Sequence, residues 1–243
     1  MIVSLHNKSV KEVAALLAKK KERDRQSLFV AEGGKMFGEA PTERISRVFI
    51  AQSAEKEMYA RYGDKLSGLS CDIVTDEVFA RMSDTVTPQG ILCLVRQRHY
   101  NIEEILRDNN KKRTLFIMLE DIQDPGNLGT IFRTAEAAGA DGVIMSSRTA
   151  DIYNPKTIRS TMGAVYRMPF LYTEDLSSVI KMMQEKGTKV YAANLGAENF
   201  YDAFDYQKST AFLIGNEANG LRDETADCAD ALLGIPMEGK VES

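Results

Sequence analysis

Residues 115–135 read LFIMLEDIQDPGNLGTIFRTA, and this stretch decides the fold of the C-terminal half of the chain. It opens with five apolar residues, Leu115–Leu119, which have the length and composition of a buried strand. Asp124, Pro125 and Gly126 are turn formers. An apolar pattern at helical spacing follows over 128–138. A buried strand, a tight turn and a helix are the first part of a parallel α/β unit.

The same alternation continues toward the C-terminus. Short apolar runs predict four further strands, and helical patterns lie between most of them. The further strands are predicted at 142–145, 189–193, 211–214 and 231–235, and the helices at 155–163, 174–186 and near 220–227. Strands that alternate with helices predict a parallel sheet covered by helices on both faces.

Three turns follow strands of this predicted sheet. Asn127 follows the first strand, Leu195 follows the strand at 189–193, and Gly215 to Glu217 follow the strand at 211–214. Because ligands of parallel sheets lie beyond the carboxyl ends of the strands, these turns are expected to converge on one rim. The sequence contains no Gly-x-Gly-x-x-Gly and no Gly-Lys-Ser/Thr, so the usual phosphate-binding loops are absent.

Taken one at a time, the residues of these turns also have purely structural explanations. The structural explanation of Asn127 is that it caps a helix. The structural explanation of Glu217 is that it is an acid at the N-terminus of another helix, where it interacts with the helix dipole. Arg133 lies about one and a half turns into the helix after Asn127, where it is either a surface arginine or a ligand of an anion near the helix start.

The N-terminal part follows a different pattern. An amphipathic helix is predicted over 7–22, and a second helix contains Met58 and Tyr59. Short apolar strands are predicted at 28–31, 47–51 and 91–95. Together they predict a small α/β domain at 1–98. A polar linker with a short helix at 102–107 follows over 99–113, and the C-terminal domain spans 114–243.

Charge is distributed unevenly along the chain, whose net charge is −4. Residues 1–35 hold eight lysines and arginines against four acids, and residues 194–243 hold three against ten. The N-terminal charges predict contact with nucleic-acid phosphates, although a solvated helix face explains them equally well. The candidate RNA-binding residues are Lys19, Lys20, Lys21, Arg23, Arg25 and Lys35.

Several functional classes find no support in the sequence. No apolar run approaches the ~18 residues of a membrane span, and the N-terminus has no apolar signal core, which predicts a cytoplasmic protein. Cys71, Cys93 and Cys228 are scattered without a Cys-x-x-Cys pair, so neither disulfides nor a zinc site is expected. His6 and His99 lie far from the glycine-rich turns, which argues against histidine acid–base chemistry there.

Three segments, taken together, resemble the three motifs of the SpoU family. They are NLGTIFRTA at 127–135, LIGNEANGL at 213–221 and IPMEGKVES at 235–243. SpoU proteins are RNA ribose 2′-O-methyltransferases of the knotted SPOUT class. Residues 27–40 resemble the start of the family's substrate-binding domain and residues 89–92 resemble its end, so the resemblance covers nearly the whole chain.

The resemblance implies an α/β fold with a small N-terminal α/β substrate-binding domain and a C-terminal parallel-sheet SPOUT domain of the trefoil-knot type. The implied cofactor is S-adenosylmethionine, and no metal is required. The substrate is ribosomal or transfer RNA. The implied catalytic residues are Arg133, Asn127, Glu217 and Ser243, and the implied cofactor-binding residues are Leu195, Gly215, Asn216, Ile235 and Met237.

Physical chemistry restricts what Arg133 is able to do. A guanidinium is effectively always protonated, so Arg133 is expected to clamp a phosphate and stabilise a developing alkoxide rather than to act as a base. Glu217 is expected to orient Arg133 or the ribose. The resemblance also implies a homodimer through the C-terminal domain, to which apolar helix residues such as Ile158 and Met162 are expected to contribute.

The chain departs from the family pattern at Ala218, where relatives often have glycine, and at Pro41, which interrupts a stretch that is often helical. It also stops inside the third motif, so the knot-forming tail is expected to be missing from the given chain. The loops at Gly215 and Ile235 are then expected to lack a covering helix, with weak cofactor binding. The alternatives are a methylation-inactive RNA-binding relative and an unrelated nucleotide-binding α/β enzyme.

Overall fold

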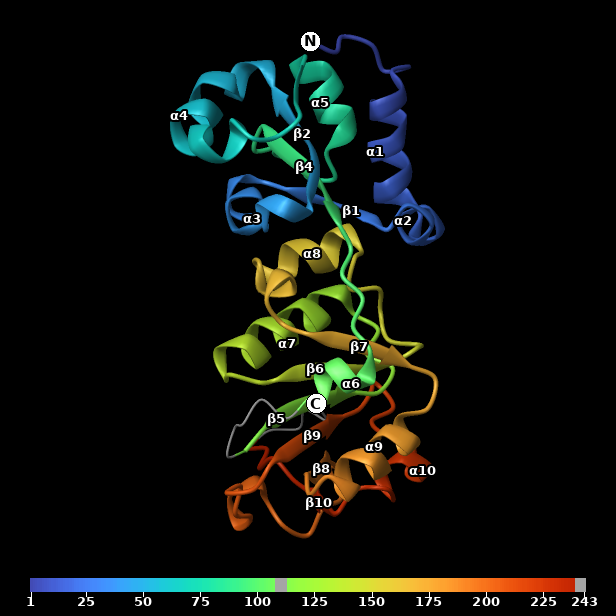
Figure 1. Ribbon diagram of the computed structural model, residues 1–243. Coiled ribbons are helices and arrows are strands. Elements are labelled where there is room, and N and C mark those ends of the chain that lie inside the picture. The colour runs from blue at the N-terminus through green and yellow to red at the C-terminus, as the bar shows by residue number, and fades with distance from the viewer. Residues whose placement is uncertain (108–112, 239–243) are drawn as a thin grey trace. The chain divides into compact units, whose positions relative to one another are not determined.

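A computed structural model describes residues 1–107 and 113–238 of the chain (Figure 1). The chain divides into two compact units. The first is Met1–Arg98 together with Asp151–Tyr166, and the second is His99–Ala150 together with the residues from Arg167 onward. The segment 151–166 therefore belongs to the first unit, although the sequence placed it in the C-terminal domain.

The first unit is built on a four-stranded sheet. Its order is β1 (Leu28–Glu32), β4 (Ile91–Arg96), β2 (Ile45–Ala51) and β3 (Cys71–Val74). The strand β4 is antiparallel to both of its neighbours, whereas β2 and β3 are parallel. The sequence did not predict β3, whose side chains are mostly only half-buried and therefore form no continuous apolar run.

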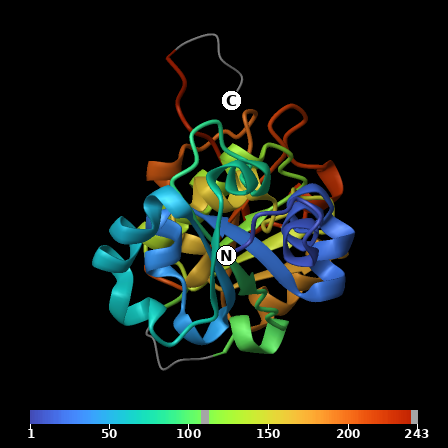
Figure 2. The ribbon, with the colours of Figure 1, turned by 90° about the horizontal axis from the view of Figure 1, so that it is seen from above.

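Helices cover this sheet from two sides. The helices α1 (Lys8–Ala18) and α5 (Asp76–Met82) share one hydrophobic core with the sheet, and α4 (Glu55–Leu66) lies on the other side from α1 in both views (Figures 1 and 2). The short α3 (Gly34–Glu39) ends before Pro41, so that proline lies outside the helix.

The single helix predicted over 7–22 is in fact two helices. The helix α1 ends at Ala18, Lys19 has extended backbone angles (φ −130°, ψ 118°), and α2 runs over Lys20–Gln26. The break allows the Arg23 guanidinium to donate hydrogen bonds to the carbonyls of Leu16 (2.7 Å) and Leu17 (3.3 Å). These carbonyls belong to the last turn of α1, which Arg23 therefore caps.

The segment 151–166 completes the first unit. Its helix α8 (Pro155–Thr161) packs against β1, and Tyr153 stacks on Phe29 with ring centroids 4.8 Å apart. Asp151 forms an ion pair with Arg23 (2.6 Å). The prediction that this helix covers the parallel sheet was wrong. Ile158 is buried, which removes it from any partner surface.

The second unit is a six-stranded sheet in which every neighbouring pair is parallel. Its order is β10 (Ala231–Leu233), β8 (Lys189–Ala193), β9 (Thr210–Ile214), β5 (Leu115–Leu119), β6 (Gly142–Ser146) and β7 (Phe170–Thr173). The predicted parallel α/β sheet is confirmed, but β7 was not predicted because its side chains are mostly half-buried. From β5 the chain continues to β6 and β7 on one side, whereas β9 lies on the other side. The boundary between β5 and β9 is therefore a topological switch point, where ligands of such sheets bind.

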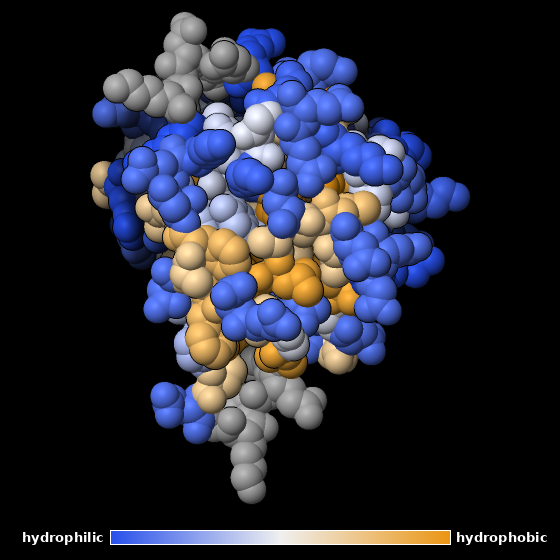
Figure 3. All heavy atoms as spheres, turned by 90° about the horizontal axis from the view of Figure 1, so that it is seen from below, coloured by the Kyte–Doolittle hydropathy of each residue, from blue (hydrophilic) through white to orange (hydrophobic). Residues whose placement is uncertain are grey.

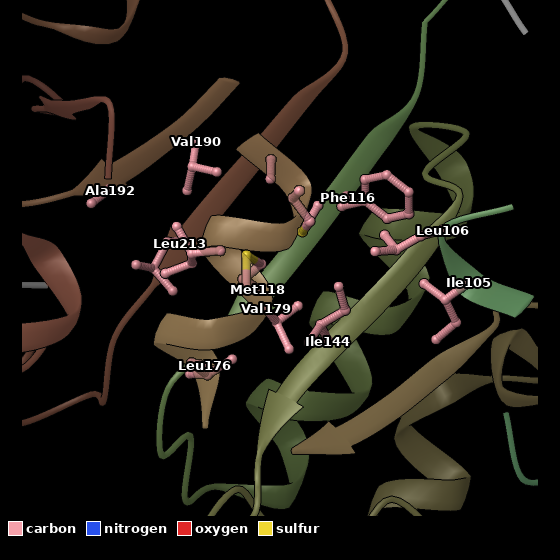
Figure 4. Close-up of a cluster of buried hydrophobic side chains, with 13 residues drawn as sticks. Ile105, Leu106, Phe116, Met118, Ile144, Leu176, Val179, Val190, Ala192 and Leu213 are labelled. Carbon is pink, nitrogen blue, oxygen red and sulfur yellow. The ribbon is translucent and has the colours of Figure 1, made fainter. Parts of the chain in front are cut away.

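Two layers of helices pack on this sheet. The helix α9 (Leu176–Glu185) and the short α6 (Ile102–Ile105) share a core with β5, β6, β8 and β9 (Figure 4). The helix α7 (Pro125–Ala137) packs against β6 and buries Leu128 and Phe132. The short α10 (Asp223–Ala226) follows β9. Across the described residues, no helix is long and apolar enough to cross a membrane.

Candidate active site at the carboxyl ends of the parallel strands

The turn between β5 and α7 is closed by its own cap. Asp124 is the N-cap of α7, where its side chain accepts a hydrogen bond from the Asn127 backbone N–H (2.8 Å), and Pro125 occupies the first helical position. Asn127 is thus the third residue of the helix, and the prediction that it caps the helix was wrong. Its side chain is free to point toward the strand ends.

Glu217, from the loop after β9, joins this turn. Its carboxylate accepts hydrogen bonds from the backbone N–H groups of Gln123 and Asp124, each 3.0 Å, and from the side-chain amide of Asn127 (3.1 Å). In a capping box, an acid at the third helical position accepts the N–H of the N-cap residue. Here Asn127 occupies the third helical position, and Glu217, from the loop after β9, accepts the N–H of the N-cap residue Asp124 instead. The first and second motifs therefore meet at the switch point.

The environment of Glu217 also sets its protonation. Partial burial acts to raise the pKa of this carboxyl, but the backbone N–H groups of Gln123 and Asp124, with the Asn127 amide, outweigh it and hold the pKa below its ordinary value. Glu217 is therefore charged at neutral pH, with its oxygens engaged by these donors. No hydrogen bond joins it to Arg133 within the described ranges, so the geometry supports its predicted orienting role only toward Asn127.

The loop that precedes α7 is held in an uncommon conformation. Asp121 has a positive φ of 55°, which is costly for a residue with a side chain. Ser146, at the end of β6, accepts a hydrogen bond from the Asp121 N–H (2.8 Å) and donates one to its carboxylate (2.6 Å). Asn216 donates to the Asp121 carbonyl (2.7 Å). Groups from β6 and β9 thus fix the loop from both sides.

A buried carboxylate beneath this rim was not predicted from the sequence. Glu120 is only 1% exposed, and it accepts hydrogen bonds from the Arg222 backbone, from the Arg222 guanidinium and from the Thr225 hydroxyl. The hydrogen bond to Glu120 raises the pKa of Arg222 above its ordinary value. An acid directly after the apolar run 115–119 was the available signal, because a charge at that place needs a buried partner.

The second motif forms a tight turn. The backbones of Asn216 and Gly220 exchange two hydrogen bonds of 2.9 Å, and a Cβ atom at Gly215 would lie 2.2 Å from the Gly220 carbonyl carbon. Only glycine fits at Gly215 for this reason. Ala218 does not have a positive φ, so the departure from glycine at this position causes no backbone strain. The Asn216 side chain accepts hydrogen bonds from the N–H groups of Ala218 and Asn219, in addition to its bond to the Asp121 loop.

The remaining cofactor candidates follow neighbouring strands. Leu195 comes after β8, whereas Ile235 and Met237 come after β10, and β10, β8 and β9 are adjacent in the sheet. Their side chains are exposed, at 71% for Leu195, 61% for Ile235 and 45% for Met237. These strand ends therefore present apolar side chains next to the Gly215 turn. Ser243 lies outside the described residues.

Arg133 lies on the exposed face of α7, about 9 Å along the helix axis from Asn127. Within residues 1–107 and 113–238, its guanidinium forms neither a hydrogen bond nor an ion pair. An unpaired guanidinium on the helix that leaves the switch point is available to bind an anion.

The candidate RNA-binding residues differ in their availability. Lys19, Lys20 and Lys21 are exposed, as is Lys35, which lies 3.9 Å from Glu39. Arg25 is also exposed and forms an ion pair with Glu22. Arg23 is only 3% exposed, and its donors are engaged by Asp151, Leu16 and Leu17. Arg23 is therefore a structural residue and is removed from the RNA-binding set.

Comparison with known protein families identifies the family of this chain. A model described as the SpoU rRNA Methylase family matches residues 114–243, and one described as the MRM3-like substrate binding domain matches residues 7–93. The chain belongs to the SpoU rRNA methylase family.

Similar proteins span nearly the whole chain. The chain is 31% identical to the 23S rRNA (guanosine(2553)-2′-O)-methyltransferase RlmP of Bacillus subtilis, over 100% of this chain and 92% of that protein. The crystal structure of an AdoMet-bound rRNA methyltransferase from Sinorhizobium meliloti matches with a TM-score of 0.85 and 31% identity, over 100% of this chain and 90% of the other. A structure described as an RNA 2′-O ribose methyltransferase matches with a TM-score of 0.82 and 28% identity, over 100% and 92% of the two chains.

Proposed function

We propose that this protein transfers a methyl group from S-adenosylmethionine to a ribose 2′-hydroxyl of ribosomal RNA, with a guanosine as the target nucleotide. The observation that carries the proposal is the contact between Glu217 and Asn127 at the switch point of a SpoU-family sheet. The target class follows the similar RlmP, which acts on a guanosine of 23S rRNA. Transfer RNA is the alternative substrate.

The strand ends suit the cofactor. Leu195, Ile235 and Met237 would hold the adenosine, since they offer exposed apolar side chains at two strand ends beside the Gly215 turn. When bound, S-adenosylmethionine supplies a methyl group on a sulfonium, and transfer of that group requires no metal.

The protein's own residues manage charge on the RNA. Arg133 binds the phosphate next to the target ribose and stabilises the negative charge that develops on the 2′-oxygen. Glu217 fixes the start of α7 and keeps the Asn127 side chain in place. Because the pKa of Glu217 is lowered and its oxygens are engaged, Glu217 is a positioning residue rather than the proton acceptor. The proton of the 2′-hydroxyl passes to solvent or to an RNA phosphate as the O–CH3 bond forms and the S–CH3 bond breaks.

Binding of RNA is assigned to the first unit, which adds 151–166 to the predicted domain at 1–98, and methyl transfer to the rest of the predicted domain at 114–243, with 99–113 as the linker. The contacts of the first unit with RNA phosphates come from Lys19, Lys20 and Lys21, which are exposed. The protein acts in the cytoplasm, where ribosomal RNA is modified.

The active form is a homodimer through the C-terminal domain. Apolar side chains gather on one face of the molecule (Figure 3), and Phe200, Tyr201 and Leu232 are exposed large apolar residues of the second unit. Sedimentation velocity at micromolar concentration tests this point. A single species of twice the chain mass is expected, and a fully active monomer would contradict it.

Methyl transfer in vitro tests the function. The protein is incubated with S-adenosylmethionine carrying a deuterated methyl group and with unmodified ribosomal RNA, and the digested RNA is examined for labelled nucleosides by mass spectrometry. Labelled 2′-O-methylguanosine is the expected product. Binding of S-adenosylmethionine and RNA without any labelled nucleoside would instead identify a methylation-inactive RNA-binding relative.

A further inference from the structure

A cavity of about 620 Å³ opens at the switch point, and of the implied cofactor-binding residues Asn216 lines it. It is lined by residues that follow β5 and β9 and by Arg148, which follows β6. Leu195, Ile235 and Met237 do not line it. Gln123 lines the cavity, and its backbone N–H donates to Glu217. Asn219 and Gly220 of the second motif also line it, so the cavity lies directly against the motif residues.

Two charged side chains of the cavity lack partners in the described part of the chain. The Arg148 guanidinium and the Asp223 carboxylate form neither an ion pair with each other nor a hydrogen bond with any described residue. By contrast, Glu120 is neutralised by Arg222, and Asp121 is held by the Ser146 hydroxyl. One free donor group and one free acceptor group therefore line the same space.

The charges of the lining determine which chemical class fits. The cavity is lined by the carboxylates Glu120, Asp121 and Asp223 and the guanidiniums of Arg148 and Arg222, so it carries no excess positive charge. A phosphate would be repelled or at best tolerated. A neutral group that presents both hydrogen-bond donors and acceptors is able to bond to both Asp223 and Arg148. In an RNA such a group is a nucleobase.

We propose that this cavity binds the guanine base of the target nucleotide, with Arg148 on O6 and N7 and Asp223 on N1–H and the 2-amino group. Guanine offers two adjacent acceptors on one edge, which match an arginine fork, and two adjacent donors on another, which match a carboxylate. Adenine, cytosine and uracil do not present both pairs. This inference rests on the proposed function and adds how the target base is selected.

Binding of free mononucleotides by the full chain tests the base selection. The 5′-monophosphates of guanosine, inosine and adenosine share one phosphate, so differences in affinity report the base alone. Guanosine monophosphate is expected to bind about tenfold more tightly than adenosine monophosphate, since a bidentate contact discriminates by roughly that factor or more. Inosine monophosphate lacks the 2-amino group and is expected to lie between them. Equal affinities for guanosine and adenosine monophosphates would overturn the proposal.

Matched variants assign the two contacts. Asp223→Asn is expected to abolish the difference between guanosine and inosine monophosphates, and Arg148→Ala to weaken both about tenfold. Glu224→Gln changes an exposed acid in the same turn of α10 that does not line the cavity, and it is expected to bind like the wild type. Unchanged affinities in both Asp223→Asn and Arg148→Ala would overturn the assignment.

Nucleotide binding and the methyl-transfer assay, taken together, separate this inference from the proposed function. A protein that prefers guanosine monophosphate but transfers no methyl group retains the base site and loses the proposed activity. A protein that methylates ribosomal RNA but binds the two purine nucleotides equally retains the activity and loses the base site.

Discussion

The basic segment around α2 and the switch point of the parallel sheet both stand out in the sequence, yet they fold differently. At the switch point, Glu217 and Asn127 come from distant parts of the chain and meet through a hydrogen bond. In the basic segment, residues that are close in the sequence differ in exposure: Lys21 faces solvent, whereas Arg23 is buried against Asp151. A parallel sheet forces its strand ends together. A cluster of charges carries no such constraint on which side chain turns inward.

The largest effect is expected from removing Arg23. Arg23→Ala removes the ion-pair partner of the half-buried Asp151 carboxylate, which keeps the Tyr153 N–H as a donor. It also removes the donor to the Leu16 carbonyl, so it is expected to lower the free energy of unfolding by about 3 kcal/mol. Arg25→Ala, which removes an arginine of the same helix that is 63% exposed, is expected to lower it by about 0.5 kcal/mol or less. Urea denaturation measures both. Equal losses in the two variants would remove the distinction between buried and exposed charges in α2.

Removing Arg133 is expected to affect turnover rather than folding. Arg133→Ala removes a guanidinium that has no partner among the described residues, and it is expected to slow methyl transfer by about a hundredfold or more. The affinity for S-adenosylmethionine is expected to stay within about twofold of the wild type. Measurement of kcat gives the loss of turnover, and titration of the cofactor gives the affinity. Lys181→Ala, at an exposed position of α9, is the control. Near wild-type kcat in Arg133→Ala would rule out this role.

Glu217 links stability to pH. Glu217→Gln places an amide donor among the N–H groups of Gln123 and Asp124, which is expected to cost about 1–3 kcal/mol of unfolding free energy at pH 7. Because the pKa of Glu217 is lowered by folding from its ordinary value near 4.5, its stabilisation is complete above that pH and is lost as the pH falls through the folded pKa. As the pH is lowered from 7 to 3, the melting temperature is therefore expected to fall more steeply for the wild type than for Glu217→Gln. Parallel pH profiles would contradict this.

The smallest effect is expected from the exposed lysines. Changing Lys19, Lys20 and Lys21 together to alanine removes three phosphate contacts, which is expected to reduce the salt slope of RNA affinity by about 2. The full chain is the right molecule for this measurement, because a 1–98 fragment lacks Asp151, the ion-pair partner of Arg23. Filter binding at several salt concentrations gives the slope. An unchanged slope would place the RNA contacts elsewhere.

The sequence predicts much of the second unit because its signals are local and repeated. The apolar runs predicted the strands β5 and β8 with their bounds, and the positions of Asn127 and Glu217 after two of the strands placed both residues on one rim. The half-buried edge strand β7 has no apolar run, so this signal missed it. The packing of 151–166 on β1 and the burial of Arg23 also depend on contacts between distant residues. The pairing of Glu120 with Arg222 is of the same kind.

The most direct test of the central claim is a map of 2′-O-methyl groups on ribosomal RNA from cells with and without the gene. Loss of the gene is predicted to remove methylation from a guanosine of ribosomal RNA. Expression of the wild-type chain is predicted to restore it, and Arg133→Ala is not. An unchanged map, or full restoration by Arg133→Ala, would contradict the assignment of a 2′-O-methyltransferase site to this switch point.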